Sequence, residues 1–194
     1  MPLITRPGVP RARKFSKAEY HEMTERGFFD GQRVELMNGE IIEMAAQKDS
    51  HAFGVRLSEA AARRVFGDGY VVMTQLPIDA GDAGEPEPDV AVIEGDLRDI
   101  TSHPTRALLI IEVSDTTLAY DRVRKASLYA SRKVPDYWIV NLIDQTVEVH
   151  RKPVRDPNAE FGWSYERKRV VRKGDTVSPN AKKGVKVAVG DLLP

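Results

Sequence analysis

Residues 108–114 read Leu-Leu-Ile-Ile-Glu-Val-Ser, an apolar run with one carboxylate near its end. A short aliphatic run bounded by polar segments is typical of a strand in the middle of a sheet. Neighbouring residues on a strand point to opposite faces, so Glu112 shares a face with Leu108 and Ile110 that other parts of the chain should cover. A buried carboxylate is costly unless it is paired, protonated or bound to a cation, so Glu112 requires a partner.

A second acidic strand lies upstream, where residues 86–93 read Pro-Glu-Pro-Asp-Val-Ala-Val-Ile. Asp89 stands at the entrance of this strand, directly after a run of turn-forming residues. Taken alone, Asp89 is best explained as a turn former, and Glu112 is as well explained by a buried ion pair as by a metal site. Two such carboxylates close together would suit a hard divalent cation.

The order of the other predicted elements indicates the fold class. Ser16 and Glu19 form a capping box, which predicts a helix from Ser16 to about Arg26. Further helices are expected at 50–66 and 118–132, and strands at 70–78, 89–93, 107–114, 134–140 and 146–150, with short strands near 163–170 and 185–189. We therefore expect an α/β or α+β fold with a central mixed sheet flanked by helices and an antiparallel C-terminal extension.

A β-hairpin is predicted around Asn38-Gly39, the strongest two-residue turn signal. The flanking strands are Arg33–Met37 and Glu40–Met44, and a two-residue turn would place Glu35 opposite Ile42. Glu35 would then lie on a mixed, half-apolar surface. An exposed hairpin position is the simpler interpretation of Glu35 taken alone.

Composition limits the possible functions. The chain has 194 residues, of which 29 are basic and 29 acidic, so its formal net charge is zero and any site for an anionic partner requires local clustering. The absence of cysteine excludes disulfides and thiolate metal sites. No apolar stretch approaches the ~18 residues of a membrane span, and we expect no membrane association and a cytoplasmic location.

The domain organisation is predicted to be simple. Residues 1–15 are rich in Pro and Arg and are expected to form a flexible N-terminal arm. Residues 16–194 are expected to form a single domain, which this length allows.

Lys125 completes the group of candidate residues. On a regular helix it shares a face with Asp121, four positions earlier, and a surface salt bridge is the simpler interpretation of that pair. His51 is expected to start the second helix, and Gln75 is left out of the predicted site. Basic residues that could contact an anionic substrate, or form a merely solvated surface, are Arg63, Arg64, Arg122, Arg124, Arg132 and Lys133.

Four ordered segments resemble the PD-(D/E)XK nuclease superfamily and, more narrowly, its Uma-type family of restriction-endonuclease-like proteins. They cover about residues 33 to 150, and any one of them alone is weak. The segments are Arg33–Ile41 (Arg-Val-Glu-Leu-Met-Asn-Gly-Glu-Ile), Glu87–Val92 (Glu-Pro-Asp-Val-Ala-Val), Ile111–Ser114 (Ile-Glu-Val-Ser), and Tyr120–Lys125 continuing to Tyr-Trp-Ile-Val at 137–140.

The resemblance implies a restriction-endonuclease-like core and a Mg²⁺- or Mn²⁺-dependent endonuclease that hydrolyses phosphodiester bonds, most simply in DNA. Asp89 and Glu112, with the backbone carbonyl of Val113, would bind the metal, and Glu35 would hold a water of the metal or a second metal. The superfamily usually has Lys where this chain has Ser114, and in the Uma-type pattern Lys125 replaces it. The implied catalytic set is Glu35, Asp89, Glu112 and Lys125, with DNA as substrate and a homodimer as the assembly.

Other functions remain open at this stage. Ser114 in place of Lys and the zero net charge are compatible with a catalytically inactive protein on the nuclease fold that binds nucleic acid. A dimerising interaction module is a further alternative, in which the Trp138 strand and the polar C-terminal strands would form a subunit interface.

Overall fold

The computed structural model describes residues 10–194, and the first nine residues of the predicted arm lie outside this part of the chain. Residues 10–15 form no helix or strand, although the backbone N–H of Phe15 donates to the carbonyl of Gly39 at 2.8 Å. The predicted division into an arm and one domain stays a prediction.

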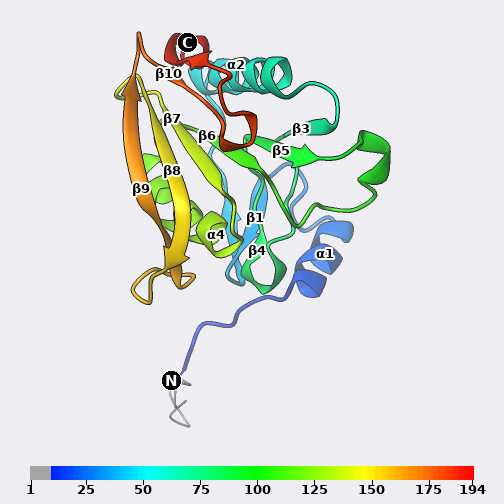
Figure 1. Cartoon of the computed structure of the whole chain (residues 1–194). Coiled ribbons are helices and arrows are strands. Elements are labelled where there is room, and N and C mark those ends of the chain that lie inside the picture. Colours follow the sequence, from blue (N-terminus) through cyan, green and yellow to red (C-terminus); the bar gives the residue numbers. More distant parts are fainter. Residues whose placement is uncertain (1–9) are drawn as a thin grey trace.

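The central feature of residues 10–194 is a six-stranded mixed sheet in the order β3-β5-β6-β7-β8-β9 (Figure 1). The pair β6–β7 is parallel, and the other neighbours are antiparallel. The mixed sheet predicted from the sequence is confirmed. The bounds are β3 Tyr70–Thr74, β5 Val90–Glu94, β6 Leu109–Ser114, β7 Asp136–Asn141, β8 Thr146–Arg155 and β9 Trp163–Arg172.

Helices cover both faces of this sheet. Helix α2 (Asp49–Phe66) packs with the C-terminal residues against one apolar cluster, which includes Val92 and Ile111. The opposite face, with Ile110 and Ile139, is covered by a helical segment made of α3 (Leu118–Tyr120), a π-helical turn (Asp121–Lys125) and α4 (Ala126–Ser131). Both faces are therefore buried, which explains why the central strands are mostly apolar.

Helix α1 (Lys17–Glu25) begins with the predicted capping box. The Ser16 side chain accepts from the Glu19 N–H, and the Glu19 side chain accepts from the Ser16 N–H. These bonds satisfy donors that the first helical turn leaves without intrahelical partners.

The predicted hairpin forms β1 (Val34–Met37) and β2 (Glu40–Glu43), and Glu35 lies opposite Ile42 as expected. A short strand β4 (Gly84–Glu85) adds to β1 and makes a separate small sheet. Met37 packs against Leu128 of α4. This contact buries the hairpin face that carries Glu35, whose exposed fraction is 1%, so the interpretation of Glu35 as an exposed hairpin position is wrong.

Several boundaries differ from the prediction. β3 ends at Thr74 rather than residue 78, while β8 and β9 each extend over ten residues. The polar sequence of β8 and β9 hides their length, because the second half of β8 is partly exposed and most of β9 faces solvent, so neither segment has a long apolar run. The predicted strand near 185–189 is shorter, β11 (Val187–Ala188), and it pairs with β10 (Thr176–Val177).

Two further predictions concern the subunit interface and membrane spans. Trp138 is 1% exposed and lies in the third-from-edge position of the sheet, so its strand cannot form the subunit interface considered above. Within residues 10–194, no helix combines the length and the apolar composition needed to cross a lipid bilayer.

Candidate functional site

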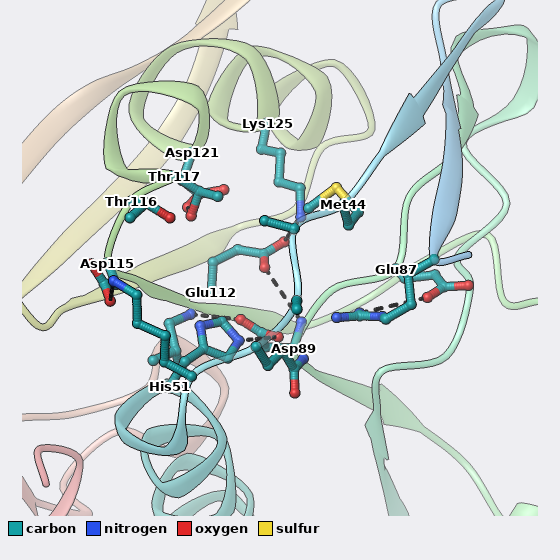
Figure 2. Close-up of a pocket in the computed structure, with 16 residues that line it drawn as sticks. Met44, His51, Glu87, Asp89, Glu112, Asp115, Thr116, Thr117, Asp121 and Lys125 are labelled. Atoms are coloured by element: carbon teal, nitrogen blue, oxygen red, sulfur yellow. Dashed lines mark hydrogen bonds and ion pairs between the residues drawn. The ribbon is translucent and has the colours of Figure 1, made fainter. Parts of the chain in front are cut away.

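The register of β5 on β6 brings the two predicted acidic residues together. Val90 pairs with Ile111 in this antiparallel pair, so the next position along places Asp89 opposite Glu112. The backbone N–H of Asp89 lies 3.4 Å from Glu112 Oε2, and the backbone N–H of Val113 donates to Asp89 Oδ2 at 2.8 Å. The two carboxylates therefore belong to one site at an end of β6, although they are far apart in the sequence (Figure 2).

Lys125 reaches the same site from the opposite side of the pocket. Its Nζ donates to Glu112 Oε1 at 3.0 Å and lies 3.8 Å from Glu35 Oε2. Lys125 is 2% exposed, so the surface salt bridge considered from the sequence is wrong. The π-helical turn widens the helix at this point, a distortion that is frequent at functional sites.

Glu35 contacts Lys125 from behind. Its carboxylate accepts from the Tyr120 hydroxyl at 3.2 Å and from the backbone N–H of Glu87 at 3.2 Å. Glu35 is not one of the residues in 10–194 that line the pocket. The structure therefore places Glu35 near the ammonium group of Lys125 rather than on the pocket surface beside Asp89.

Asp121 and Ser114 form a buried hydrogen-bonded pair next to these residues. The Ser114 hydroxyl donates to Asp121 Oδ2 at 2.6 Å, and the Thr117 hydroxyl donates to the same oxygen at 2.8 Å. Through this hydrogen bond Ser114, at the end of β6, anchors the π-helical turn that carries Lys125.

Three further residues contact the carboxylates, and the predicted site did not include them. His51 Nε2 and Gln75 Nε2 both lie 3.3 Å from Asp89 Oδ1. The buried Tyr129 hydroxyl donates to Glu112 Oε1 at 2.7 Å. Tyr129 lies four positions after Lys125, so helical spacing was the one signal that could have placed it on the same side as the lysine.

The charges of the pocket shift the pKa values of its members. Burial raises the pKa of Glu112 to about 8; the charge of Asp89 adds to this rise and that of Lys125 opposes it. Burial alone would raise the pKa of Asp89, but the hydrogen bond and charge of His51, with Lys125 and the Val113 N–H, outweigh it and lower that pKa. Burial disfavours the charge of Lys125, yet the surrounding carboxylates, led by Glu112 and Glu35, raise its pKa well above the usual value.

This donor set fits a hard cation. The two oxygens with only long contacts, at 3.3 and 3.4 Å, are Asp89 Oδ1 and Glu112 Oε2. Within residues 10–194, no group of three or more His, Asp or Glu side chains is arranged to hold a metal ion. A cation here would be held by two carboxylates, with a backbone carbonyl and water as further ligands, and this is a ligand set that Mg²⁺ accepts.

A pocket opens on the acidic pair. Its walls come from the segment between β2 and α2, the start of α2, the end of β6 and the π-helical turn (Figure 2). Besides Lys125, the cations that line it are Arg33 and Lys48, neither of which was among the predicted substrate contacts. The predicted cations lie elsewhere, and several are paired: Arg122 with Glu148, Arg124 with Glu40 and Glu160, Arg63 with Glu59, and Arg64 with Asp191.

Comparison with known proteins places this geometry in a family. The model of the Uma2 family, described as putative restriction endonucleases, matches residues 18–190. The fold is similar to that of a crystal structure described as a putative nuclease belonging to DUF820 from Anabaena variabilis ATCC 29413. The TM-score is 0.66 at 16% sequence identity, over 92% of this chain and 97% of that chain. No curated protein matches the sequence. The family resemblance and the restriction-endonuclease-like α+β fold predicted above are confirmed.

Proposed function

Because the chain belongs to the Uma2 family of restriction-endonuclease-like proteins, we propose that it is a metal-dependent nuclease that hydrolyses phosphodiester bonds in DNA. The observation that carries the proposal is the convergence of Asp89, Glu112 and Lys125 at one pocket. Two carboxylates and one ammonium group at such a site suit the chemistry of a phosphodiester, whose charge must be neutralised before a nucleophile attacks.

Each residue of the site has a defined part in this proposal. Asp89 and Glu112, with the carbonyl of Val113, would hold Mg²⁺ or Mn²⁺. The metal would act as a Lewis acid toward the phosphate and would lower the pKa of water. Lys125, kept charged by the carboxylates around it, would orient the attacking water or stabilise the charge that develops on the phosphoryl oxygens.

Glu35 is assigned a different part from the one the sequence suggested. Its 3.8 Å contact with the Lys125 ammonium group and its hydrogen bond from Tyr120 support a positioning role for the lysine. The lysine side chain is long and flexible, and a fixed carboxylate on its far side limits the directions in which the ammonium group can point.

The arrangement around Ser114 favours an active enzyme over an inactive nuclease fold. Ser114 leaves no cation at the usual superfamily position, but Lys125 donates to the same glutamate, Glu112, at 3.0 Å. A cation thus remains beside the acidic pair. We include a homodimer in the proposal, because cleavage of both DNA strands uses two sites, together with a cytoplasmic location.

The test is cleavage of supercoiled plasmid with Mg²⁺ or Mn²⁺, analysed on agarose gels. We expect Asp89→Asn and Glu112→Gln to lose activity by at least about 10³-fold and Lys125→Met by about 10²- to 10³-fold, as when a charge-stabilising group is removed. The control is Glu166→Gln, whose exposed carboxylate pairs with Lys152 on the β8–β9 ribbon, and it should cleave like the wild type.

Two outcomes would count against the proposal. Equal cleavage by the wild type and all site variants would trace the activity to another site or to a contaminant. DNA binding that is steeply salt-dependent, without cleavage in either metal, would instead support the inactive nucleic-acid-binding alternative.

A further inference from the structure

The segment between β2 and α2 lies against the proposed active site. Residues 44–48, here called the strap, form no helix or strand, and all five line the pocket. Met44 lines the pocket together with Lys125 and Glu112, and all three are labelled in Figure 2. The strap ends at Lys48, the N-cap residue of α2, which makes no side-chain capping bond to the helix.

An ion pair joins the strap to the other wall of the pocket. Lys48 Nζ donates to Asp115 Oδ2 at 2.9 Å, and Asp115 directly follows β6, three residues after Glu112. Both residues line the pocket. The Lys48 side chain is 62% exposed, and such exposed pairs typically contribute ~0–1 kcal/mol, so thermal motion can break this contact easily.

The walls of the pocket, the strap among them, leave Asp89 only 6% exposed and Glu112 only 3% exposed. The pocket volume is about 60 Å³, which is enough for a few water molecules. A phosphate group would therefore reach these two carboxylates more readily if the strap moved away from the pocket.

We propose that the strap is a gate, that the Lys48–Asp115 ion pair is its latch, and that Lys48 binds a substrate phosphate once the latch opens. This inference rests on the proposed nuclease function. A phosphate group that approaches the pocket offers Lys48 a new anionic partner, while the Asp115 carboxylate repels it. The polyanionic substrate thus replaces Asp115 as the partner of Lys48. The Lys48 ammonium group then binds a substrate phosphate instead of holding the strap against Asp115.

The first arm of the test follows the gate without any need for activity. Amide hydrogen exchange of residues 44–48 is compared in the wild type, Lys48→Gln and Asp115→Asn. Loss of an exposed ion pair should speed exchange in the strap by about two- to fivefold in both variants. The matched control is Lys152→Gln, which removes another exposed lysine, paired with Glu166 at 2.8 Å on the β8–β9 ribbon, and should leave the strap unchanged.

The second arm measures binding of a short DNA duplex in EDTA over a range of salt concentrations. Lys48→Gln should weaken binding several-fold and lower the slope of log K against log salt concentration by about one, the change expected for one lost phosphate contact. Asp115→Asn should bind more tightly than the wild type. Lys152→Gln should match the wild type in both affinity and slope.

The outcomes separate this inference from the proposed function. Unchanged strap exchange in both latch variants would overturn the gate. Wild-type affinity and slope in Lys48→Gln would overturn the phosphate contact, even if the protein cleaves DNA. Faster strap exchange with the expected binding changes, but no cleavage by the wild type, would reject the nuclease and leave the gate standing. Failure of both the wild type and Asp115→Asn to bind DNA in EDTA would reject the phosphate contact, and the plasmid cleavage assay would then decide the nuclease separately.

Discussion

Asp136 and the Asp89–Glu112 pair are buried carboxylates of the same sheet, but their surroundings differ. Asp136 accepts four short contacts, from Trp138 Nε1 at 2.8 Å, Arg151 Nε at 2.7 Å, Arg151 Nη2 at 3.1 Å and the Asn180 N–H at 2.8 Å. Its charge is matched by one guanidinium group, and no oxygen is left without a close donor.

The acidic pair is less completely satisfied. One oxygen of each carboxylate has only contacts of 3.3 to 3.4 Å. Within residues 10–194, Lys125 is the one buried ammonium group at this site, and the charges of four buried carboxylates raise its pKa. Burial by itself therefore does not distinguish the two sites. Long contacts and an excess of like charge do, because they leave an oxygen and a charge for a ligand to satisfy.

The largest effect should come from breaking the saturated cluster. Asp136→Ala should lower the free energy of unfolding by about 3–5 kcal/mol, because it leaves the Arg151 guanidinium and two N–H donors without their acceptor. Urea unfolding followed by circular dichroism measures this, with Glu166→Ala on β9 as a control that should change stability by less than about 0.5 kcal/mol. A loss below about 1 kcal/mol for Asp136→Ala would remove the contrast between the two sites.

A metal should stabilise the unsaturated pair and leave the saturated one unaffected. Mn²⁺ at a hundredfold excess over its Kd should add about 2.7 kcal/mol to wild-type stability, and Asp89→Asn should abolish this gain. In EDTA, Asp89→Asn should differ from the wild type by less than about 1 kcal/mol, because the amide still accepts from the Val113 N–H and the lost charge contact with His51 is offset by weaker repulsion of Glu112. Urea unfolding with and without Mn²⁺ checks both values, and equal Mn²⁺ stabilisation in the variant would place the metal elsewhere.

A fourth carboxylate, Glu148, extends the comparison to pH. Burial alone would raise the pKa of Glu148, but contacts from His150, Arg122 and Asn141 outweigh burial and lower the pKa to about 2. The unfolded chain binds this proton near pH 4.5, so the stability from Glu148 is present above that pH and is lost as the pH falls toward 2. The loss should be on the order of 2 kcal/mol relative to Glu148→Gln, measured by urea unfolding between pH 5 and 2.5. Parallel pH profiles of the two proteins would contradict it.

The smallest effect concerns a single hydroxyl group at the acidic pair. Tyr129→Phe removes the 2.7 Å donor to Glu112, and it should cost about 1 kcal/mol of stability and reduce kcat/KM for cleavage several-fold. The matched control is Tyr165→Phe, which removes a buried hydroxyl that donates to the Val134 carbonyl at 2.9 Å. Tyr165→Phe should lose a similar amount of stability but keep wild-type cleavage activity. If the two variants lost equal stability and equal activity, Tyr129 would have a purely structural role.

Much of the local structure could be predicted from the sequence. The Ser16–Glu19 capping box and the Asn38-Gly39 turn act over two or three residues, and the structure contains both. The apolar runs at 89–93 and 107–114 mark central strands because their composition suits a position with both faces covered. The order of these elements predicted the fold class, a central mixed sheet flanked by helices, and the ordered motifs pointed to the family and its restriction-endonuclease-like core.

Only the tertiary structure decided how these elements meet. The register of β5 on β6 places Asp89 opposite Glu112, and packing of the hairpin against α4 buries Glu35. The π-helical turn aims Lys125 at Glu112, and the fold brings His51 and Gln75 to Asp89. Short-range signals depend on neighbours within about four residues, whereas burial and the distances between charges depend on contacts across the sheet, which no local pattern specifies.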